Sequence, residues 1–119
     1  MPKVTVGDQS AEIQEGKRLV LAIEQELGVD ILHRCGGYAQ CTTCRVTFQD
    51  GEPQAMTAAE KERLEAREIL GEFRLSCQVP VTADMTVKPA MRVSTTEFDE
   101  PGDTPMTEIT PDPEWVEQP

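Results

Sequence analysis

Four cysteines constrain this chain more than any other feature of its sequence. Three of them lie close together as Cys35-x5-Cys41-x2-Cys44, and the fourth, Cys77, follows after 32 intervening residues. A chain of 119 residues suits one domain with a limited core, so bonds made by these cysteines would help it to fold. The N-terminus has no apolar stretch typical of a secretion signal, which favours a reducing compartment and metal-binding thiolates. We therefore expect a cytoplasmic protein, or one of an organelle matrix or stroma if a presequence has been removed.

The charge of the chain restricts its partners. The formal net charge is −11 and the pI is about 4.4, the reverse of the basic footprint that nucleic-acid binding requires. Residues 95–119 contain eight acidic residues and no Lys or Arg, which leaves −3 for residues 1–94. No apolar run approaches the roughly 20 residues that span a membrane. The sequence thus predicts no nucleic-acid binding, no membrane span and basic protein partners met by electrostatic steering.

The first part of the chain shows strand and helix patterns before the cysteines. Apolar residues alternate with polar ones on both sides of Gly7-Asp8-Gln9, which predicts an N-terminal β-hairpin. Apolar residues then recur at helical spacing, and Gly28 follows as a C-cap, so we expect a helix over about 17–27. Residues 30–44 are rich in small residues and have no period, which indicates a loop that carries three of the cysteines.

The second part repeats strand and helix signals. A short strand at Val46–Phe48 ends at the Asp50-Gly51 turn, and Thr57 with Glu60 has the capping-box spacing for a helix to about Leu70. Alternation over residues 73–79 puts Cys77 on or beside a strand, and a last strand is expected around residues 85–87. This order predicts an α+β fold, a small mixed sheet with a helix packed across one face.

Residues 95–119 differ from the rest of the chain. Five prolines are interleaved with the acidic residues, a composition that favours an extended or disordered segment. We therefore divide the chain into a domain over residues 1–94 and an acidic, Pro-rich C-terminal extension over residues 95–119.

The cysteine spacing suits a centre of two irons bridged by sulfides, which takes four thiolates. The x2 step brings two sulfurs to one compact centre, and the distant Cys77 would fix the loop to the rest of the fold. Gly36 and Gly37 allow a loop that curls closely, so that its N–H groups donate to the sulfurs.

Other uses of the same residues remain open at this point. Four cysteines could form two disulfides, and they could bind one structural zinc, although only Cys41 and Cys44 form a C-x2-C knuckle. A Rieske centre needs two His ligands, and the chain has a single histidine, His33, expected at the surface or beside the site. The alternating charges of the helix capped by Thr57, which begin at Glu60, indicate a solvated, salt-bridged face.

The motif Cys35-Gly-Gly-Tyr-Ala-Gln-Cys41-Thr-Thr-Cys44, with Arg74-Leu-Ser-Cys77-Gln far downstream, resembles the [2Fe-2S] ferredoxins of β-grasp (ubiquitin-like) fold. The five-residue gap after Cys35 is similar to adrenodoxin-like members, whereas plant-type members have four residues there. The resemblance implies one [2Fe-2S] cluster, with Cys35 and Cys41 on one iron and Cys44 and Cys77 on the other. It also implies that the iron in the loop lies near the surface and takes the electron.

The same resemblance implies a function and partners. We expect a monomeric single-electron carrier and not an enzyme, docked transiently by a ferredoxin reductase and electron-acceptor enzymes. Two departures, Arg45 where adrenodoxin-like proteins have His and a helix of mixed rather than acidic charge, argue for a divergent bacterial or cyanobacterial plant-like member as well. Two alternatives remain: a redox or iron-status sensor that acts through the C-terminal extension, and a structural zinc-binding domain.

Overall fold

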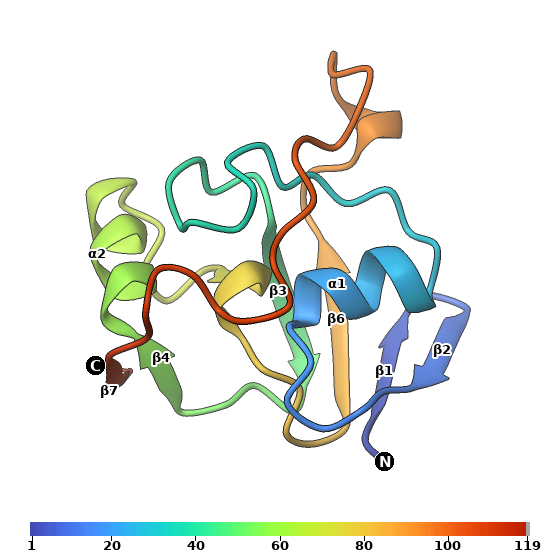
Figure 1. Ribbon diagram of the computed structural model, residues 1–119, viewed down its shortest axis with the longest axis horizontal. Coiled ribbons are helices and arrows are strands. Elements are labelled where there is room, and N and C mark those ends of the chain that lie inside the picture. Colours follow the sequence, from blue (N-terminus) through green and yellow to red (C-terminus); the bar gives the residue numbers. More distant parts are fainter. Residues whose placement is uncertain (119) are drawn as a thin grey trace.

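A five-stranded mixed sheet forms the centre of the computed structural model, which describes residues 1–118 (Figure 1). The strand order is β2-β1-β6-β3-β5; β1 and β2 form an antiparallel hairpin, β1 and β6 are parallel, and the other pairs are antiparallel. The strands of this sheet are β1 (Lys3–Val6), β2 (Gln9–Glu12), β3 (Arg45–Asp50), β5 (Arg74–Leu75) and β6 (Met85–Pro89).

The first helix packs across one face of this sheet, as predicted (Figure 1). It consists of one α-helical turn, α1 (Leu19–Leu21), continued by a π-helical segment, η1 (Ala22–Glu26). Its first five residues, 19–23, are all buried against the sheet. The mixed sheet and its helix confirm the α+β, β-grasp class.

The helix begins two residues later than the apolar spacing predicts. Residues 16–19 are instead paired with residues 79–81: the Gly16 N–H donates to the Val81 carbonyl at 2.8 Å, and the Leu19 N–H donates to the Val79 carbonyl at 2.8 Å. This pairing holds residue 18 in extended conformation, with φ −62° and ψ 134°. The side chain of Arg18 is thereby directed into the protein rather than along a helix surface.

The second helix, α2 (Ala58–Ala66), begins where the capping-box spacing predicts. The Glu60 N–H donates to the Thr57 hydroxyl at 3.1 Å, as expected for an N-cap. The helix ends at Ala66 rather than near Leu70, because Glu68 adopts a left-handed conformation with φ 60°.

The C-terminal extension is extended and lies on the domain. It leaves β6 through a 3₁₀ turn, η3 (Val93–Thr95), and then runs down the helix side of the molecule, passing between α1 and the cysteine loop toward α2 (Figure 1). It ends in β7 (Trp115–Glu117), which pairs antiparallel with β4 (Ala55–Thr57) in a second, two-stranded sheet that the sequence pattern does not predict. The predicted boundary between residues 94 and 95 stays a prediction, and Pro119 lies outside the described residues.

Within residues 1–118, no helix has the length and apolar character needed to cross a bilayer.

Candidate metal centre

A tightly curled loop between the first helix and β3 carries three of the four cysteines. Four of its residues have positive φ, which reverses the chain repeatedly within a few residues: Gly36 (73°), Gly37 (89°), Ala39 (58°) and Thr42 (57°). The need for unusual backbone angles at the two glycines, predicted from the sequence, is confirmed. The positive φ values at Ala39 and Thr42 were not predicted, because residues other than glycine rarely adopt them and a β-branched threonine does so least readily.

The fourth cysteine belongs to a segment that follows the loop after 32 intervening residues. Cys77 lies in a 3₁₀ turn, η2 (Ser76–Gln78), directly after β5, so it sits beside a strand. The Ser76 N–H and hydroxyl both donate to the Cys44 carbonyl, at 3.2 and 2.7 Å, and so connect the two cysteine segments. All four cysteines are free of disulfide bonds.

The four sulfurs form two pairs that differ in exposure. Cys35 and Cys41 are half-buried and joined by the Cys35 N–H, which donates to Cys41 Sγ at 3.2 Å, whereas Cys44 and Cys77 are buried and joined through Ser76, whose hydroxyl donates to the Cys44 carbonyl at 2.7 Å. One pair therefore lies at the rim of the loop and the other beneath it. This arrangement in twos suits a two-iron centre, in which each iron takes two thiolates.

Hydrogen-bond donors surround the sulfurs. The Cys35 N–H donates to Cys41 Sγ at 3.2 Å, the Gln40 N–H donates to Cys35 Sγ at 3.4 Å, and the Thr43 N–H lies 3.5 Å from Cys41 Sγ. The Thr43 hydroxyl is 2.9 Å from Cys41 Sγ, and the Gln78 side-chain amide is 3.5 Å from Cys77 Sγ. Donors of this kind stabilise thiolates and tune the reduction potential of iron–sulfur centres.

The thiol pKa values respond to this pairing. The hydrogen bond from the Cys41 thiol lowers the pKa of Cys35 to about 4 against the effect of burial, and raises the pKa of Cys41. In the inner pair, the same kind of bond lowers the pKa of Cys77 and raises the pKa of Cys44. Thiolates are the form that metal ligation requires, so binding a cluster here would release the protons of these thiols.

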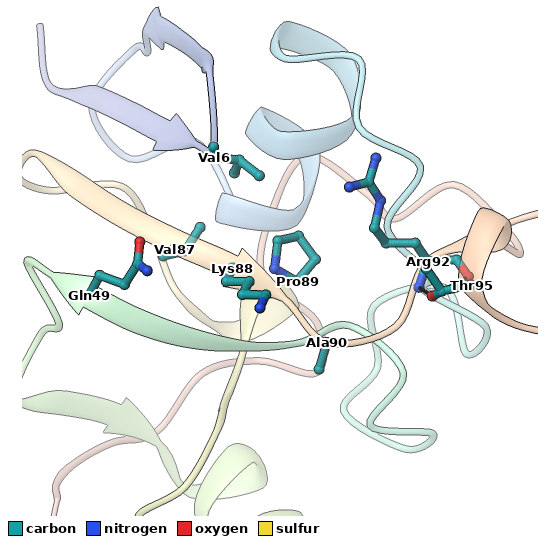
Figure 2. A pocket seen from close by; sticks show the side chains of 9 residues that line it. Val6, Gln49, Val87, Lys88, Pro89, Ala90, Arg92 and Thr95 are labelled. Atoms are coloured by element: carbon teal, nitrogen blue, oxygen red, sulfur yellow. Dashed lines mark hydrogen bonds between the residues drawn. The ribbon is translucent and has the colours of Figure 1, made fainter.

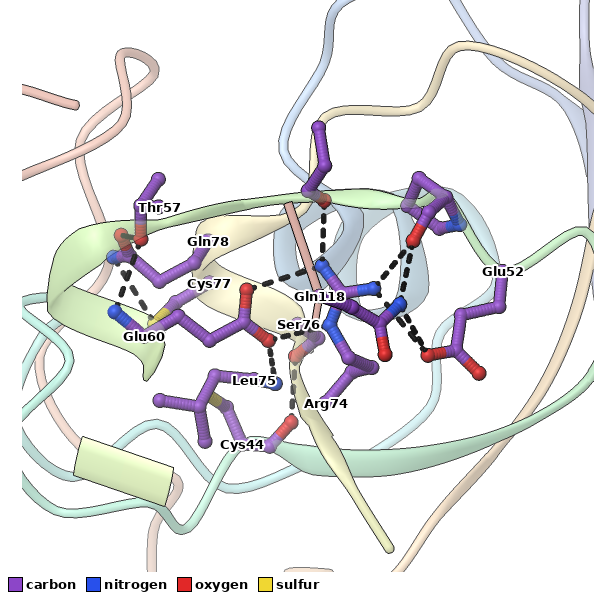
Figure 3. A network of polar contacts seen from close by, with 12 residues as sticks. Cys44, Glu52, Thr57, Glu60, Arg74, Leu75, Ser76, Cys77, Gln78 and Gln118 are labelled. Carbon is purple, nitrogen blue, oxygen red and sulfur yellow. Dashed lines mark hydrogen bonds and ion pairs between the residues drawn. The ribbon is translucent and has the colours of Figure 1, made fainter. Parts of the chain in front are cut away.

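A buried ion pair holds the segment that bears Cys77. Glu60 is fully buried; its carboxylate accepts from Arg74 Nε at 2.8 Å and from the Leu75 N–H at 2.8 Å (Figure 3). The other guanidinium nitrogens of Arg74 donate to the carbonyls of Pro53 and Ala55 at 2.8 and 3.0 Å. This network connects α2, the β4 segment and β5, and so fixes the direction in which the chain enters the Cys77 turn.

The prediction that Glu60 lies on a solvated face is therefore wrong. Its position three residues after the cap accounts for its N–H, but its side chain turns inward to Arg74. Alternating charges in the sequence do not distinguish the one carboxylate that has a buried partner from its exposed neighbours.

Gln78 is a further site residue that the sequence analysis did not single out. Its amide donates to the carbonyls of Gly37 and Thr110, at 3.4 and 2.7 Å, and its Oε1 accepts from the Thr57 hydroxyl at 2.7 Å. It thereby joins the cysteine loop, α2 and the C-terminal extension. Its place directly after Cys77 is the only sequence signal for this role.

His33 lies beside the loop and is buried. Its Nε2 is 2.5 Å from a Glu24 carboxylate oxygen, so it is fixed against the first helix. Tyr38, in contrast, is exposed at the top of the loop, and its hydroxyl contacts Met106 Sδ of the extension at 3.8 Å.

A cavity of about 440 Å³ lies away from the cysteines. Its walls come from the ends of β1, β3 and β6 and from the turn that follows β6, and Figure 2 shows Lys88 and Pro89 among the side chains that line it. It contains no cysteine and no cluster of titratable groups that would suit catalysis.

Among residues 1–118, no group of three His, Cys, Asp or Glu side chains is gathered closely enough to hold a single metal ion.

Comparison with known proteins agrees with the geometry. Residues 4–82 match the family of 2Fe-2S iron-sulfur cluster binding domains. The chain is 39% identical over 83 residues to 2Fe-2S ferredoxin-5 of Aquifex aeolicus (strain VF5), an alignment that covers 66% of this chain and 85% of the relative. The crystal structure of an ISC-like [2Fe-2S] ferredoxin from Pseudomonas putida superposes with a TM-score of 0.60, at 24% identity, over 74% of this chain and 91% of that one, which shows the shared fold.

A second kind of relative is much longer. A subunit of the Na(+)-translocating NADH-quinone reductase of Idiomarina loihiensis is 33% identical over 81 residues, which are 68% of this chain but 19% of the relative. The chain thus spans about a fifth of that relative. From the family match over residues 4–82, the ferredoxin relatives and the shared fold, we conclude that this chain belongs to the [2Fe-2S] ferredoxin family and that its cofactor is one [2Fe-2S] cluster.

Proposed function

We propose that this chain is a single-electron carrier whose cluster is held by Cys35, Cys41, Cys44 and Cys77. The observation that carries the proposal is the placement of the four cysteines, two half-buried at the rim of the loop and two buried beneath it, with their segments joined by hydrogen bonds. When bound, the cluster accepts and releases one electron. The residues of the chain orient the sulfurs, donate hydrogen bonds to them and keep water from the inner pair.

The exposed side of the site is where electrons would enter and leave. Cys35 and Cys41 lie nearest the surface, beneath Tyr38 and Gln40, which are exposed. Distance limits electron transfer, so a partner would dock over this part of the loop. The iron held by Cys35 and Cys41 would then be the one that is reduced.

Partners are proposed from the relatives and from charge. The longer relative is named as part of an NADH-quinone reductase and is about five times longer than the matched region. For this chain we propose a separate ferredoxin reductase as donor and one or more acceptor enzymes, bound through small, transient interfaces. The net charge of −11 favours partners that present basic surfaces.

The first test is the visible absorption spectrum of anaerobically purified protein, before and after dithionite, with EPR of the reduced sample. We expect a red-brown protein that bleaches on reduction and gives a spin-one-half signal. A colourless protein that contains one zinc and no iron would contradict the proposal.

The ligand assignment is tested by changing each cysteine to Ala in turn. Each of the four variants should fail to retain a stable cluster, as measured by iron and sulfide content per chain. Gln40→Ala is the matched control, because Gln40 lies in the same loop and contributes its backbone N–H, not its side chain, to Cys35 Sγ. A cysteine variant with full iron content would remove that residue from the ligand set.

A second candidate function is a redox sensor that acts through residues 95–118. It is favoured by the contacts of Thr110 with Gly37 and Gln78 beside the cysteine loop. A sensor requires that access of protease to the extension differ between the oxidised and reduced protein. Equal cleavage rates in the two states would exclude this function.

A further inference from the structure

Arg18 is the largest fully buried side chain among residues 1–118. Its Nε donates to the Cys77 carbonyl at 2.8 Å, and its Nη2 donates to the Gly37 carbonyl at 2.6 Å. The guanidinium therefore lies between the two chain segments that supply the sulfurs. A buried cation is costly unless its charge is balanced, so this position requires an explanation.

The hydrogen-bond acceptors of Arg18 are all neutral. Its Nη1 donates to the carbonyls of Met106 and Glu108, both at 3.0 Å, and approaches the Thr110 hydroxyl at 3.4 Å. Within residues 1–118, no carboxylate lies within ion-pair distance of this guanidinium. Carbonyl groups satisfy its N–H donors, but they leave its positive charge without a counter-ion.

The other deeply buried arginine shows what a balanced charge looks like in this fold. Arg74 has the fully buried Glu60 carboxylate 2.8 Å from its Nε. Within the described residues, the fold thus supplies a buried carboxylate to Arg74 but none to Arg18.

The negative charge that Arg18 faces belongs to the cysteine site. Burial lowers the pKa of Arg18, and the neighbouring sulfurs of Cys77, Cys44 and Cys35 raise it. Four thiolates around two irons leave the centre with net negative charge, and reduction adds one more unit. In a buried region with a low effective dielectric constant, a fixed positive charge lowers the energy of that added electron.

We propose that Arg18 is the buried counter-charge of the cluster site, and that the C-terminal extension keeps it dry and in position. This inference rests on the proposed electron-carrier function. Arg18 is a positioning residue: its guanidinium donates hydrogen bonds to the Gly37 and Cys77 carbonyls and so holds its charge beside the sulfurs. Its charge raises the reduction potential, so the cluster of this protein is easier to reduce than the same cluster without Arg18.

The extension has a defined part in this arrangement. Residues 106–110 supply the acceptors for Nη1 of the Arg18 guanidinium. The Thr110 hydroxyl also donates to the Gly37 carbonyl at 3.1 Å. Water at this position would solvate Arg18 and screen its charge. By keeping water away from Arg18, the extension affects the reduction potential of the site as well as its stability.

The test is the midpoint potential of the full-length protein, measured by spectroelectrochemistry for wild type, Arg18→Met, Arg18→Gln and Arg18→Lys. Arg18→Gln is measured together with Arg18→Met, because the glutamine amide can still donate to one of the carbonyls that Arg18 contacts in the wild type. Arg63→Gln is the matched control: it removes the same charge from a side chain that contacts Gln40 of the loop in an exposed position. The titrations are repeated at low and high salt.

We expect Arg18→Met and Arg18→Gln to lower the equilibrium constant for reduction at least about tenfold, which is about 59 mV for a one-electron couple. This shift should persist at high salt, because salt screens buried charges poorly. Arg18→Lys should stay near the wild-type potential but expose residues 103–110 to protease, since one ammonium cannot hold all the carbonyls. Arg63→Gln should shift the potential only slightly, and high salt should abolish that shift.

A neutral variant with an intact cluster and an unchanged potential would overturn the inference. If both neutral variants fail to take up a cluster, Arg18→Lys decides: cluster uptake at the wild-type potential supports the counter-charge, and loss of the cluster there overturns it. These outcomes are distinct from a failure of the proposed function, in which wild-type protein itself would show no cluster or no bleaching.

Discussion

At the scale of single residues, the cysteine loop depends on backbone conformations that most side chains disfavour. Gly37 combines a φ of 89° with a crowded position, since an added Cβ would lie 2.7 Å from Arg18 Nη2 and 2.9 Å from Pro105 Cβ. Its carbonyl accepts hydrogen bonds from both Arg18 and Thr110. One small residue thus allows the loop, the buried cation and the extension to meet.

Gly37→Ala should therefore cost more than backbone strain alone. Gly71 is a matched control, because its φ is 90° and no atom lies within 4 Å of an added Cβ. We expect Gly71→Ala to lower the free energy of unfolding by about 1 to 3 kcal/mol without changing iron content. Gly37→Ala should lower it further and reduce cluster occupancy, as measured by urea unfolding and iron content. Equal losses in the two variants would show that packing at Gly37 is unimportant.

Asp30 gives the protein a specific pH dependence. Although burial opposes it, the hydrogen bonds from Arg92 Nε and the Ser94 N–H, at 2.6 and 2.7 Å, lower the pKa of Asp30 to about 2. The pKa in the unfolded chain is about 3.9, so the stabilisation is complete above about pH 4 and is lost as pH falls toward about 2.

Because Asp30 and Arg92 are about one-third exposed, we expect the contribution to be about 1 kcal/mol. Asp30→Asn should lower the free energy of unfolding by that amount at pH 6 and by little near pH 2. Chemical denaturation across this range measures it. A loss that stays constant down to pH 2 would contradict the role of the ionised carboxylate.

At the scale of elements, the buried Glu60–Arg74 pair joins α2 to β5. Burial raises the pKa of Glu60, while Arg74 and the Leu75 N–H oppose that effect, so the carboxylate depends on its partners. A buried pair of this kind fixes the relative position of two elements more than it adds net stability. Here it sets the start of the turn that bears Cys77.

Removing either partner should be worse than removing both. We expect Glu60→Met or Arg74→Met to lower the free energy of unfolding by about 3 to 5 kcal/mol, because each leaves a buried charge without its buried partner. The double variant should lose less than either single variant, which a double-mutant cycle by urea unfolding measures. Strictly additive losses would mean that the pair does not act as a unit.

At the scale of the whole molecule, the extension runs along the helix side of the domain, from the end of β6 to α2 (Figure 1). It contributes acceptors to Arg18 and Gln78, its Glu114 carbonyl accepts from the Ala58 N–H at 2.7 Å, and β7 pairs with β4. The proposed cluster site thus lies where the loop, the Cys77 turn and the extension meet. Its occupation should affect the stability of all three.

Removing the cluster should therefore destabilise the entire fold. We expect apo-protein, prepared by anaerobic acid treatment, to unfold at a lower temperature than the loaded protein and to exchange amide hydrogens faster in residues 32–44 and 103–110. Reconstitution with iron and sulfide should restore both properties, which serves as the control for damage. An unchanged unfolding temperature would show that the fold does not depend on its metal centre.

Local sequence patterns are sufficient for the features that depend on near neighbours. The hairpin around Gly7, the N-cap at Thr57 and the curled loop at Gly36 and Gly37 follow from residues a few positions apart, and so does the Cys35-x5-Cys41-x2-Cys44 part of the family motif. Such patterns report which face of an element is apolar and where the chain turns. They therefore give elements and candidate ligands, but not the partners of a single charged side chain.

The positions of the buried cation and of the acidic extension depend instead on contacts between segments that are far apart in the sequence. Arg18 and the carbonyls that hold it are separated by 59 residues at Cys77 and by 88 and 90 residues at Met106 and Glu108. Arg18 itself looks in the sequence like a polar residue at a helix start, and the extension looks like a solvated acidic segment. Their burial depends on contacts across the whole fold, because a charged group enters a protein interior only where distant segments supply its hydrogen bonds and counter-charge together.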